Sequence, residues 1–159
     1  MSFEKVKNYF EKAGLGQRVI ALEKSSATVE EAAKAIGCQA KEIAKTMAFF
    51  VDDKPILIVT AGDAKIDNKK YKNTFNQKAK MIPGEQVETY VGHAPGGVCP
   101  FAVPIDVTVY LDVSLKRFET VYPAGGNGQS AVKLSLEELV KYSNASGWVD
   151  VCKDWPEND

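Results

Sequence analysis

The spacing of apolar and polar residues predicts two helices in the first part of the chain. Apolar side chains recur at helical spacing over residues 3–10, and a glycine-rich stretch then ends that helix. A second helix is predicted to begin after Thr28, because Glu31 three positions later completes a capping-box pattern. Gly37 is typical of the residue that ends a helix in the left-handed conformation.

The clearest strand signal is a pair of apolar runs separated by a turn. Residues 46–51 and 56–60 are rich in β-branched and aromatic side chains, whereas residues 52–55 contain Asp, Lys and Pro, which favour a reversal of the chain. We therefore predict an antiparallel hairpin. A helical turn is predicted over residues 39–43, with Lys45 at the end of this helix-patterned segment.

The remainder of the chain predicts further short elements around two glycine-rich loops, at residues 92–104 and 124–128. Strands are predicted over residues 18–22, 107–112, 119–123, 130–134 and 148–152. Helical segments are predicted in the lysine-rich region after residue 66, as one or two short helices, and over residues 85–90, 114–118 and 136–142. Many short strands interrupted by helices predict an α+β fold around a mixed sheet that is strongly curved or barrel-like.

Length and composition favour one globular domain. The chain has 159 residues, and we expect a single domain over residues 1–152 followed by a loose acidic tail over residues 153–159. Hydrophobic residues make up 45% and charged residues 26%, which excludes a disordered or fibrous class. No apolar run approaches the ~20 residues that a membrane helix needs, and the N-terminus lacks the apolar core of a signal peptide. We expect a cytoplasmic protein.

The cysteines indicate neither a disulfide framework nor a zinc site. Cys38, Cys99 and Cys152 are odd in number, far apart and free of any CxxC spacing. We therefore expect reduced thiols, no metal and no cofactor.

Lysines are concentrated in one stretch, although the formal net charge is only -1. This stretch contains a single acid, Asp67, and six lysines: Lys65, Lys69, Lys70, Lys72, Lys78 and Lys80. Such a local excess of positive charge attracts the phosphates of a nucleic acid. The alternative interpretation is a solvated helix face with no partner.

Lys45 and the Gly-Pro loop at residues 96–101 are the strongest candidates for a ligand site. A half-buried lysine costs free energy unless an anion or a carbonyl partners it, and Gly and Pro hold backbone amides and carbonyls in fixed positions. Together they predict a site for a negatively charged ligand. The structural alternatives are a lysine that interacts with a helix dipole, worth about 0.3–1 kcal/mol, and a simple turn.

A series of short motifs, in this order, resembles the YbaK/ProX family. The motifs lie at residues 28–33, 37, 43–47, 61–63, 92–101, 124–126 and 134–139. This family comprises free-standing aminoacyl-tRNA deacylases and the related editing insertion domain of bacterial prolyl-tRNA synthetase. The resemblance spans residues 20 to 152 and implies a mixed, highly curved sheet flanked by helices. It also implies hydrolysis of the ester that joins a wrong amino acid to tRNA, with tRNA(Pro) as the expected carrier.

The resemblance also implies roles for individual residues. Lys45 falls on a lysine thought to meet the terminal phosphate of the tRNA or the carbonyl region of the substrate. The family's Gly-x-x-x-Pro loop, which shapes the pocket near the scissile ester, matches Gly96, Gly97 and Pro100. Contacts to the substrate are expected from Thr46, Asp63, His93, Val98, Cys99, Phe101, Gly125, Gly126 and Asn127, and contacts to tRNA from Lys65, Lys69, Lys70 and Lys72. Asn127 stands where the family often has a basic residue, which leaves the identity of the substrate open.

The chemistry that the resemblance implies needs no protein nucleophile. An aminoacyl ester is already activated, so a positioned water and loop amides that stabilise the oxyanion suffice, with a hydroxyl or thiol of the substrate as further assistance. A rival enzymatic hypothesis uses Cys99 as nucleophile and His93 as base. A third hypothesis, from a different class, is a non-catalytic module that binds tRNA or prolyl-tRNA synthetase. The sequence does not indicate an oligomeric state.

Overall fold

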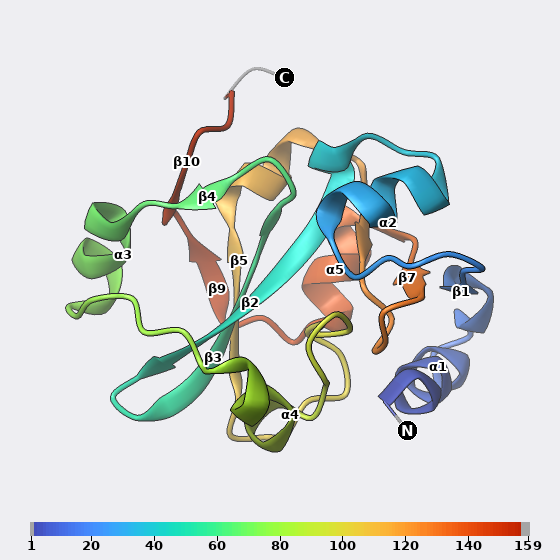
Figure 1. Ribbon diagram of the computed structural model, residues 1–159, viewed down its shortest axis with the longest axis horizontal. Helices are drawn as coiled ribbons and strands as arrows, with labels where there is room; N and C mark the ends of the chain where they lie inside the picture. The colour runs from blue at the N-terminus through green and yellow to red at the C-terminus, as the bar shows by residue number, and fades with distance from the viewer. Residues whose placement is uncertain (1, 157–159) are drawn as a thin grey trace.

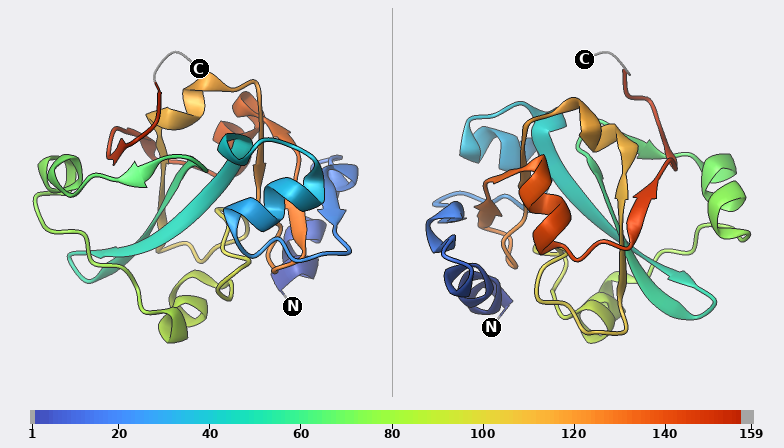
Figure 2. Two further views of the ribbon diagram at one scale, coloured as in Figure 1. Left: turned by 45° about the horizontal axis from the view of Figure 1, so that its top comes forward. Right: turned by 180° about the vertical axis from the view of Figure 1, so that it is seen from behind.

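The centre of the fold is a six-stranded mixed sheet with helices on both faces (Figure 1). A computed structural model describes residues 2–156. The strands follow the order β8-β6-β2-β3-β5-β9, with β2 at Ile43–Val51, β3 at Lys54–Ala61, β5 at Thr108–Asp112, β6 at Thr120–Pro123, β8 at Leu134–Ser135 and β9 at Gly147–Val149. Two small sheets pair β1 (Val19–Ala21) with β7 (Ser130–Val132), and β4 (Lys65–Ile66) with β10 (Cys152–Lys153). The predicted α+β class with a strongly curved mixed sheet is confirmed (Figure 2).

Five α-helices surround this sheet in the described part of the chain. They are α1 (Ser2–Lys12), α2 (Val29–Ile36), α3 (Asn68–Phe75), α4 (Gly84–Val91) and α5 (Leu136–Tyr142), and 3-10 turns lie at Gly16–Arg18, Ala40–Glu42 and Val113–Arg117. The capping box predicted at Thr28 forms in part, and a complete one begins α5. Thr28 accepts a hydrogen bond from the Glu31 amide, whereas Ser135 and Glu138 form both bonds of the box. Within residues 2–156, no helix has both the length and the apolar character needed to cross a bilayer.

The β2–β3 hairpin is the core of the sheet, as predicted. Its antiparallel register runs from Ala44 opposite Ala61 to Val51 opposite Lys54, and β3 also pairs in parallel with β5. Because β3 has a neighbour on each side and is covered on both faces, Leu57, Ile58 and Val59 are fully buried. This explains why the sequence of β3 is a continuous apolar run and does not alternate.

Successive phenylalanines at the far end of β2 attach helices to opposite faces of the sheet. The ring centroid of Phe49 lies 5.2 Å from that of Tyr71 in α3, and that of Phe50 lies 4.9 Å from that of Tyr90 in α4. Neighbouring side chains of a strand point to opposite faces, so this pair fixes one helix on each side. A second aromatic cluster connects α1 to the rest of the molecule, because Phe10 contacts Phe101 at 4.8 Å and Tyr142 at 5.6 Å between centroids.

The start of β2 differs from the prediction. Lys45 was expected at the end of a helical segment, but it lies inside the strand, which already begins at Ile43. The helical turn ends at Glu42, and the next two residues pair in parallel with Tyr122 and Pro123 of β6. This pairing joins segments about eighty positions apart, so local sequence patterns do not reveal it.

Two other predicted strands also differ. Residues 130–134 and 148–152 were each expected to form one strand, but each divides into two strands of different sheets, β7 with β8 and β9 with β10. The second division follows from Asp112, which accepts a hydrogen bond from the Val151 amide at 2.9 Å. The lysine-rich region forms the single helix α3. Lys153, expected in a loose tail, pairs in β10, while residues 157–159 of that tail lie outside the described residues.

The two glycine-rich loops pack backbone against backbone. A Cβ atom built on Gly97 would lie 2.4 Å from the Asn127 nitrogen and 2.5 Å from the Gly126 carbonyl carbon. Gly96 has a φ of +91°, a conformation that side-chain-bearing residues rarely adopt. The loop that follows α4 therefore requires glycine at both positions in order to lie against the loop between β6 and β7.

We predict that Gly97→Ala destabilises the protein by about 1–3 kcal/mol, because the new methyl group collides with backbone that has no room to move aside. The measurement is urea-induced unfolding followed by tryptophan fluorescence. Gly147→Ala is the matched control, since a Cβ at Gly147 meets nothing within 4 Å, and it should change stability by less than about 1 kcal/mol. Equal stability of the two variants would contradict this account of the loop contact.

Candidate functional site

A cavity of about 170 Å³ opens where α2, the start of β2, the end of β6 and the two glycine loops converge. Its lining includes Thr28 and Val29 at the N-terminus of α2, Lys45 and Thr46 of β2, and Gly96 of the loop that follows α4. The lysine and the Gly-Pro loop that the sequence singled out therefore lie at the same hollow. Segments from five separate regions of the chain form its wall.

The parallel pairing of β2 with β6 positions the floor of this cavity. Ile43 and Ala44 pair with Tyr122 and Pro123, and all four residues line the cavity. Helix α2 packs on the same place, because its buried Ala32 and Ala33 form a small apolar cluster with Ile43. Small side chains on α2 allow the helix to pack directly on the strand.

Lys45 carries a half-buried ammonium for which the described residues provide no partner. Burial lowers the pKa of its ammonium and Lys65 lowers it further, whereas the carboxylates of Asp63 and Glu30 raise it. None of these groups forms a hydrogen bond or an ion pair with the Lys45 ammonium in the described part of the chain. A desolvated cation that its own protein leaves unpaired favours a bound anion or carbonyl oxygen.

Thr46 supplies a second unpartnered polar group. Its hydroxyl is buried and has no hydrogen-bond partner among residues 2–156, and Thr46 lines the cavity. Leaving a buried hydroxyl unsatisfied costs about 1–3 kcal/mol.

The loop amides divide into two kinds. The Gly97 amide donates to the Ala94 carbonyl at 3.0 Å and so maintains the turn. The amides of Gly96 and Val98, which both line the cavity, have no hydrogen-bond partner within the described residues. Of the loop groups expected to stabilise an oxyanion, Gly96 and Val98 thus have available donors, whereas the Gly97 amide is already engaged.

Two serines that the sequence analysis missed hold the wall together. The Ser26 hydroxyl donates to the Ser130 carbonyl at 3.1 Å and accepts from the Ser130 amide at 2.9 Å. The Ser130 hydroxyl in turn accepts from the Gly125 amide at 3.1 Å. Both serines are buried and line the cavity. Local sequence gave no signal for them, because serines beside glycines and helix caps are common in ordinary turns.

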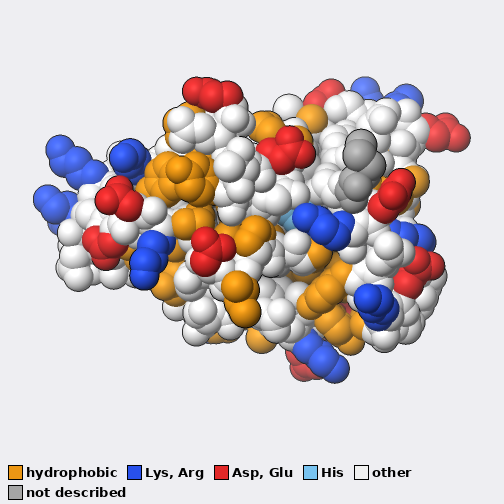
Figure 3. All heavy atoms as spheres, turned by 90° about the horizontal axis from the view of Figure 1, so that it is seen from below, with side chains coloured by type: hydrophobic (Ala, Val, Ile, Leu, Met, Phe, Trp, Pro, Cys, Tyr) orange, Lys and Arg blue, Asp and Glu red, His pale blue; other side chains and the backbone are white. Residues whose placement is uncertain are grey.

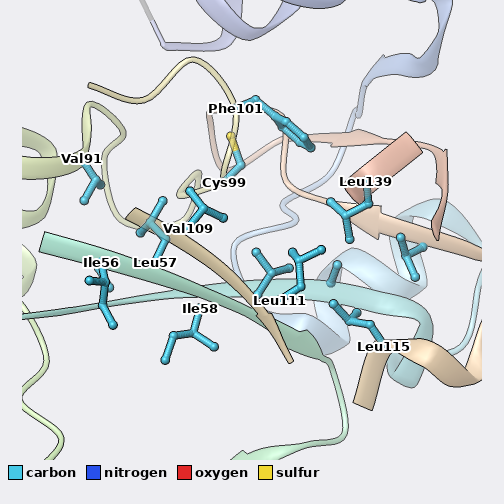
Figure 4. Packing of buried hydrophobic residues seen from close by; sticks show 14 of the residues in the cluster. Ile56, Leu57, Ile58, Val91, Cys99, Phe101, Val109, Leu111, Leu115 and Leu139 are labelled. Carbon is cyan, nitrogen blue, oxygen red and sulfur yellow. The ribbon is translucent and has the colours of Figure 1, made fainter. Parts of the chain in front are cut away.

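His93, Cys99 and Phe101 do not line the cavity, contrary to the expectation that they contact substrate. All three are fully buried, and Figure 4 shows Cys99 and Phe101 among the apolar side chains of the core. The His93 Nε2–H group donates to the Phe101 carbonyl at 2.7 Å, and Nδ1 accepts from the Ser2 hydroxyl. Burial lowers the pKa of His93 and raises that of Cys99 to about 12, so the thiol stays protonated although its sulfur lies 3.5 Å from Nε2.

Other expected site residues also lie outside the cavity lining. Pro100 is buried and faces a separate hollow that Tyr9 helps to line. Asp63 forms an ion pair with Arg117. Gly125 and Gly126 are buried in the second glycine loop, where Gly126 lies against the Ser2 backbone, while Asn127 is exposed. These two glycines lie in the loop between the lining residues Ala124 and Ser130 but do not line the cavity themselves.

The lysine-rich stretch covers α3 and the segments beside it. Lys65, Lys69 and Lys72 are exposed, whereas Lys70 donates to Asp150 at 3.2 Å and to the Cys152 carbonyl at 2.9 Å. Figure 3 shows Lys and Arg side chains gathered, with some acidic ones, at the end of the molecule where Figure 1 places α3. Within residues 2–156, no three His, Cys, Asp or Glu side chains come together in a metal-binding arrangement.

Comparison with known proteins gives relatives along almost the whole chain. An uncharacterized protein from Bacillus subtilis (strain 168), YwhH, is 50% identical over 156 residues, which cover 98% of this chain and 99% of the relative. The proline–tRNA ligase of Desulfovibrio desulfuricans is 32% identical over 126 residues, but these are 78% of this chain and only 21% of the ligase. The chain thus corresponds to about a fifth of the ligase.

A solved structure and a family model relate this chain to the same group of proteins. A solved structure of a candidate trans-editing enzyme for prolyl tRNA synthetase superposes with a TM-score of 0.85 at 27% identity, over 96% of this chain and 97% of that chain. The family model of the aminoacyl-tRNA editing domain matches residues 23–142, which include the whole wall of the cavity. The chain therefore belongs to the aminoacyl-tRNA editing domain family.

Proposed function

We propose that this protein is a trans-editing hydrolase that cleaves the ester bond of mischarged aminoacyl-tRNA. The observation that carries this proposal is a cavity lined by residues with three kinds of polar group that lack partners among residues 2–156: the Lys45 ammonium, the Thr46 hydroxyl and the amides of Gly96 and Val98. An aminoacyl ester at the end of a tRNA offers a phosphate and carbonyl oxygens to such groups.

The reaction requires little covalent participation by the protein. A water adds to the ester carbonyl, the bond between that carbon and the ribose oxygen breaks, and the ribose oxygen takes up a proton to leave free tRNA and a free amino acid. The Gly96 and Val98 amides are the available donors for the oxyanion of the tetrahedral intermediate. Lys45 holds the phosphate or the carbonyl region, and the buried loops keep the reacting groups in place.

The size of the cavity favours a small aminoacyl group. About 170 Å³ is well below the roughly 300–1,000 Å³ of pockets that hold drug-sized ligands. The ligase and the trans-editing relative are both associated with proline by name, which supports tRNA(Pro) as the carrier. We therefore propose Ala, Cys, Ser or Thr on tRNA(Pro) as the substrates to test, with aminoacyl-tRNA and prolyl-tRNA synthetase as partners in the cytoplasm.

Substitution of Lys45 tests the proposal directly. We expect Lys45→Met to reduce deacylation by about 10²–10³-fold, because the ligand loses a charged partner in a desolvated site. The measurement is release of labelled Ala, Cys, Ser or Thr from mischarged tRNA(Pro). Lys54→Met, at the exposed turn of the β2–β3 hairpin, is the control and should retain full activity. If the unaltered protein releases none of the four amino acids yet binds tRNA, the protein is a non-catalytic binding module.

The cysteine hypothesis has its own test. Cys99→Ala should retain hydrolysis, because the Cys99 thiol is buried in the core, stays protonated and does not line the cavity. The same deacylation assay is paired with a thermal unfolding curve, since the smaller side chain lowers stability by about 1 kcal/mol or more. Loss of activity with an intact fold would establish a covalent role for Cys99 and reject the positioned-water mechanism.

The lysine-rich stretch predicts salt-dependent tRNA binding. We expect the logarithm of the tRNA association constant to fall linearly with the logarithm of salt concentration, and the double variant Lys69→Ala/Lys72→Ala to lower the slope by about one for each phosphate contact removed. Filter binding at several salt concentrations gives the slope. Lys12→Ala, on α1 away from α3 (Figure 1), is the control. An unchanged slope in the double variant would exclude these lysines from the tRNA interface.

A further inference from the structure

Strand β2 has two different partners along its outer edge, which is the edge that faces away from β3. At the start of the strand, β6 pairs with it in parallel as far as Ala44. Towards the far end, the segment before α4 pairs with it from Ala48 onward, and the Ala48 carbonyl accepts from the Ile82 amide at 3.0 Å. Neither partner reaches Thr46, which lies between the two paired stretches.

The main-chain groups of Thr46 point into this break in the pairing. Further along β2, Phe50 lies opposite Pro55, which has no N–H, and the Phe50 amide instead donates to the Lys80 carbonyl at 2.9 Å on the outer edge. Main-chain groups of successive residues alternate between the two edges of a strand. Thr46, four positions earlier, therefore also directs its N–H and C=O away from β3, and no backbone partner meets them among residues 2–156.

The break in the pairing opens onto the cavity. Thr46 lines the cavity, and so do Pro123 and Ala124, which are the end of β6 on the same edge and the residue that follows it. A rise of about 3.3 Å per residue places the two paired positions, Ala44 and Ala48, roughly 13 Å apart along β2. Because both ends of this interval are already paired, it accepts a group as long as one amino-acid residue but not a further strand.

An aminoacyl ester requires a hydrogen-bond acceptor in the cavity as well as donors. The Lys45 ammonium and the amides of Gly96 and Val98 are donors, which suit the phosphate and carbonyl oxygens of that ester. Its α-ammonium is itself a donor, and no Asp or Glu is among the described residues that line the cavity. The α-ammonium must therefore bond to a hydroxyl or a main-chain carbonyl, and the Thr46 carbonyl lies on the open edge.

We propose that the aminoacyl group pairs with Thr46 as a single added strand residue: its α-ammonium donates to the Thr46 carbonyl, and its own carbonyl accepts from the Thr46 amide. Two residues of neighbouring antiparallel strands exchange the same two bonds. A carbonyl oxygen accepts two hydrogen bonds, so the bond from Thr46 leaves a second one for a loop amide. This inference takes its ligand from the proposed function and adds the group that selects a free α-amino group.

The first experiment observes the Thr46 carbonyl directly by NMR. Thr46 and Met47 form the only Thr-Met step in the chain, so isotopic labelling of Thr carbonyl carbons and Met nitrogens gives one HNCO signal. The probe is adenosine that carries alanine through a stable amide in place of the ester, and the comparison compound carries propionate, which lacks the α-ammonium. We expect the alanyl compound to move the Thr46 signal downfield and to bind about 10–100-fold more tightly, because hydrogen bonds from charged donors are the stronger ones.

Two controls assign the effect to the main chain of Thr46. The Ala48 carbonyl, already bonded to the Ile82 amide, should keep its chemical shift. Thr46→Val removes the side-chain hydroxyl but keeps the carbonyl, so the preference for the alanyl compound should persist. Loss of that preference in Thr46→Val would overturn the proposal in favour of the hydroxyl. An alanyl compound that shifts the Gly96 and Val98 amides but not the Thr46 carbonyl would also overturn it.

The second experiment uses the reaction itself. Ala-tRNA(Pro) is compared with lactyl-tRNA(Pro), in which a hydroxyl replaces the α-ammonium, and each rate is divided by that of the uncatalysed hydrolysis of the same ester. We expect kcat/KM for the lactyl ester, corrected in this way, to be about 10–100-fold lower. Equal corrected values would contradict the proposal. If neither ester is cleaved while the alanyl compound shifts the Thr46 carbonyl, the proposed hydrolysis fails and the Thr46 contact stands, whereas absence of any binding rejects both.

Discussion

The parallel pairing between the first residues of β2 and the last residues of β6 is the contact on which the site depends. It is only two residues long, Ile43 with Tyr122 and Ala44 with Pro123, yet it brings together the strand that carries Lys45 and the segment that leads into the second glycine loop. Helix α2 then packs on this junction through small side chains. Without that pairing, the two glycine loops and the N-terminus of α2 would have no common wall.

The cavity combines a rigid frame with polar groups that have no hydrogen-bond partner in the described residues. The frame comes from close backbone contact at Gly97 and from the paired serines Ser26 and Ser130. Inside this frame the protein leaves an ammonium, a hydroxyl and two amides without partners in the described residues. Unsatisfied buried polar groups are destabilising, so their occurrence in residues that line one hollow supports the ligand site that we propose.

Burial also explains the state of the residues with the most reactive side chains, which lie outside the cavity. His93 and Cys99 have each other, a backbone carbonyl and the core as neighbours, and burial keeps both in their neutral forms. Asp63 is likewise bonded to Arg117. His93 and Cys99 thus belong to the core and Asp63 to an ion pair, whereas Lys45, Gly96 and Val98 line the cavity.

The sequence by itself determined the α+β class, the central hairpin and the cap at Thr28, and it singled out Lys45 and Gly96 as candidate site residues. These features depend on local patterns, namely residue alternation, capping residues and glycines, which a reader of one chain can recognise. The tertiary structure decided that Lys45 lies in a strand, that residues 130–134 and 148–152 each serve two sheets, and that Ser130 belongs to the site while Phe101 belongs to the core. Strand pairing between distant segments and burial depend on where the whole chain places its neighbours, and that information is absent from any single stretch of residues.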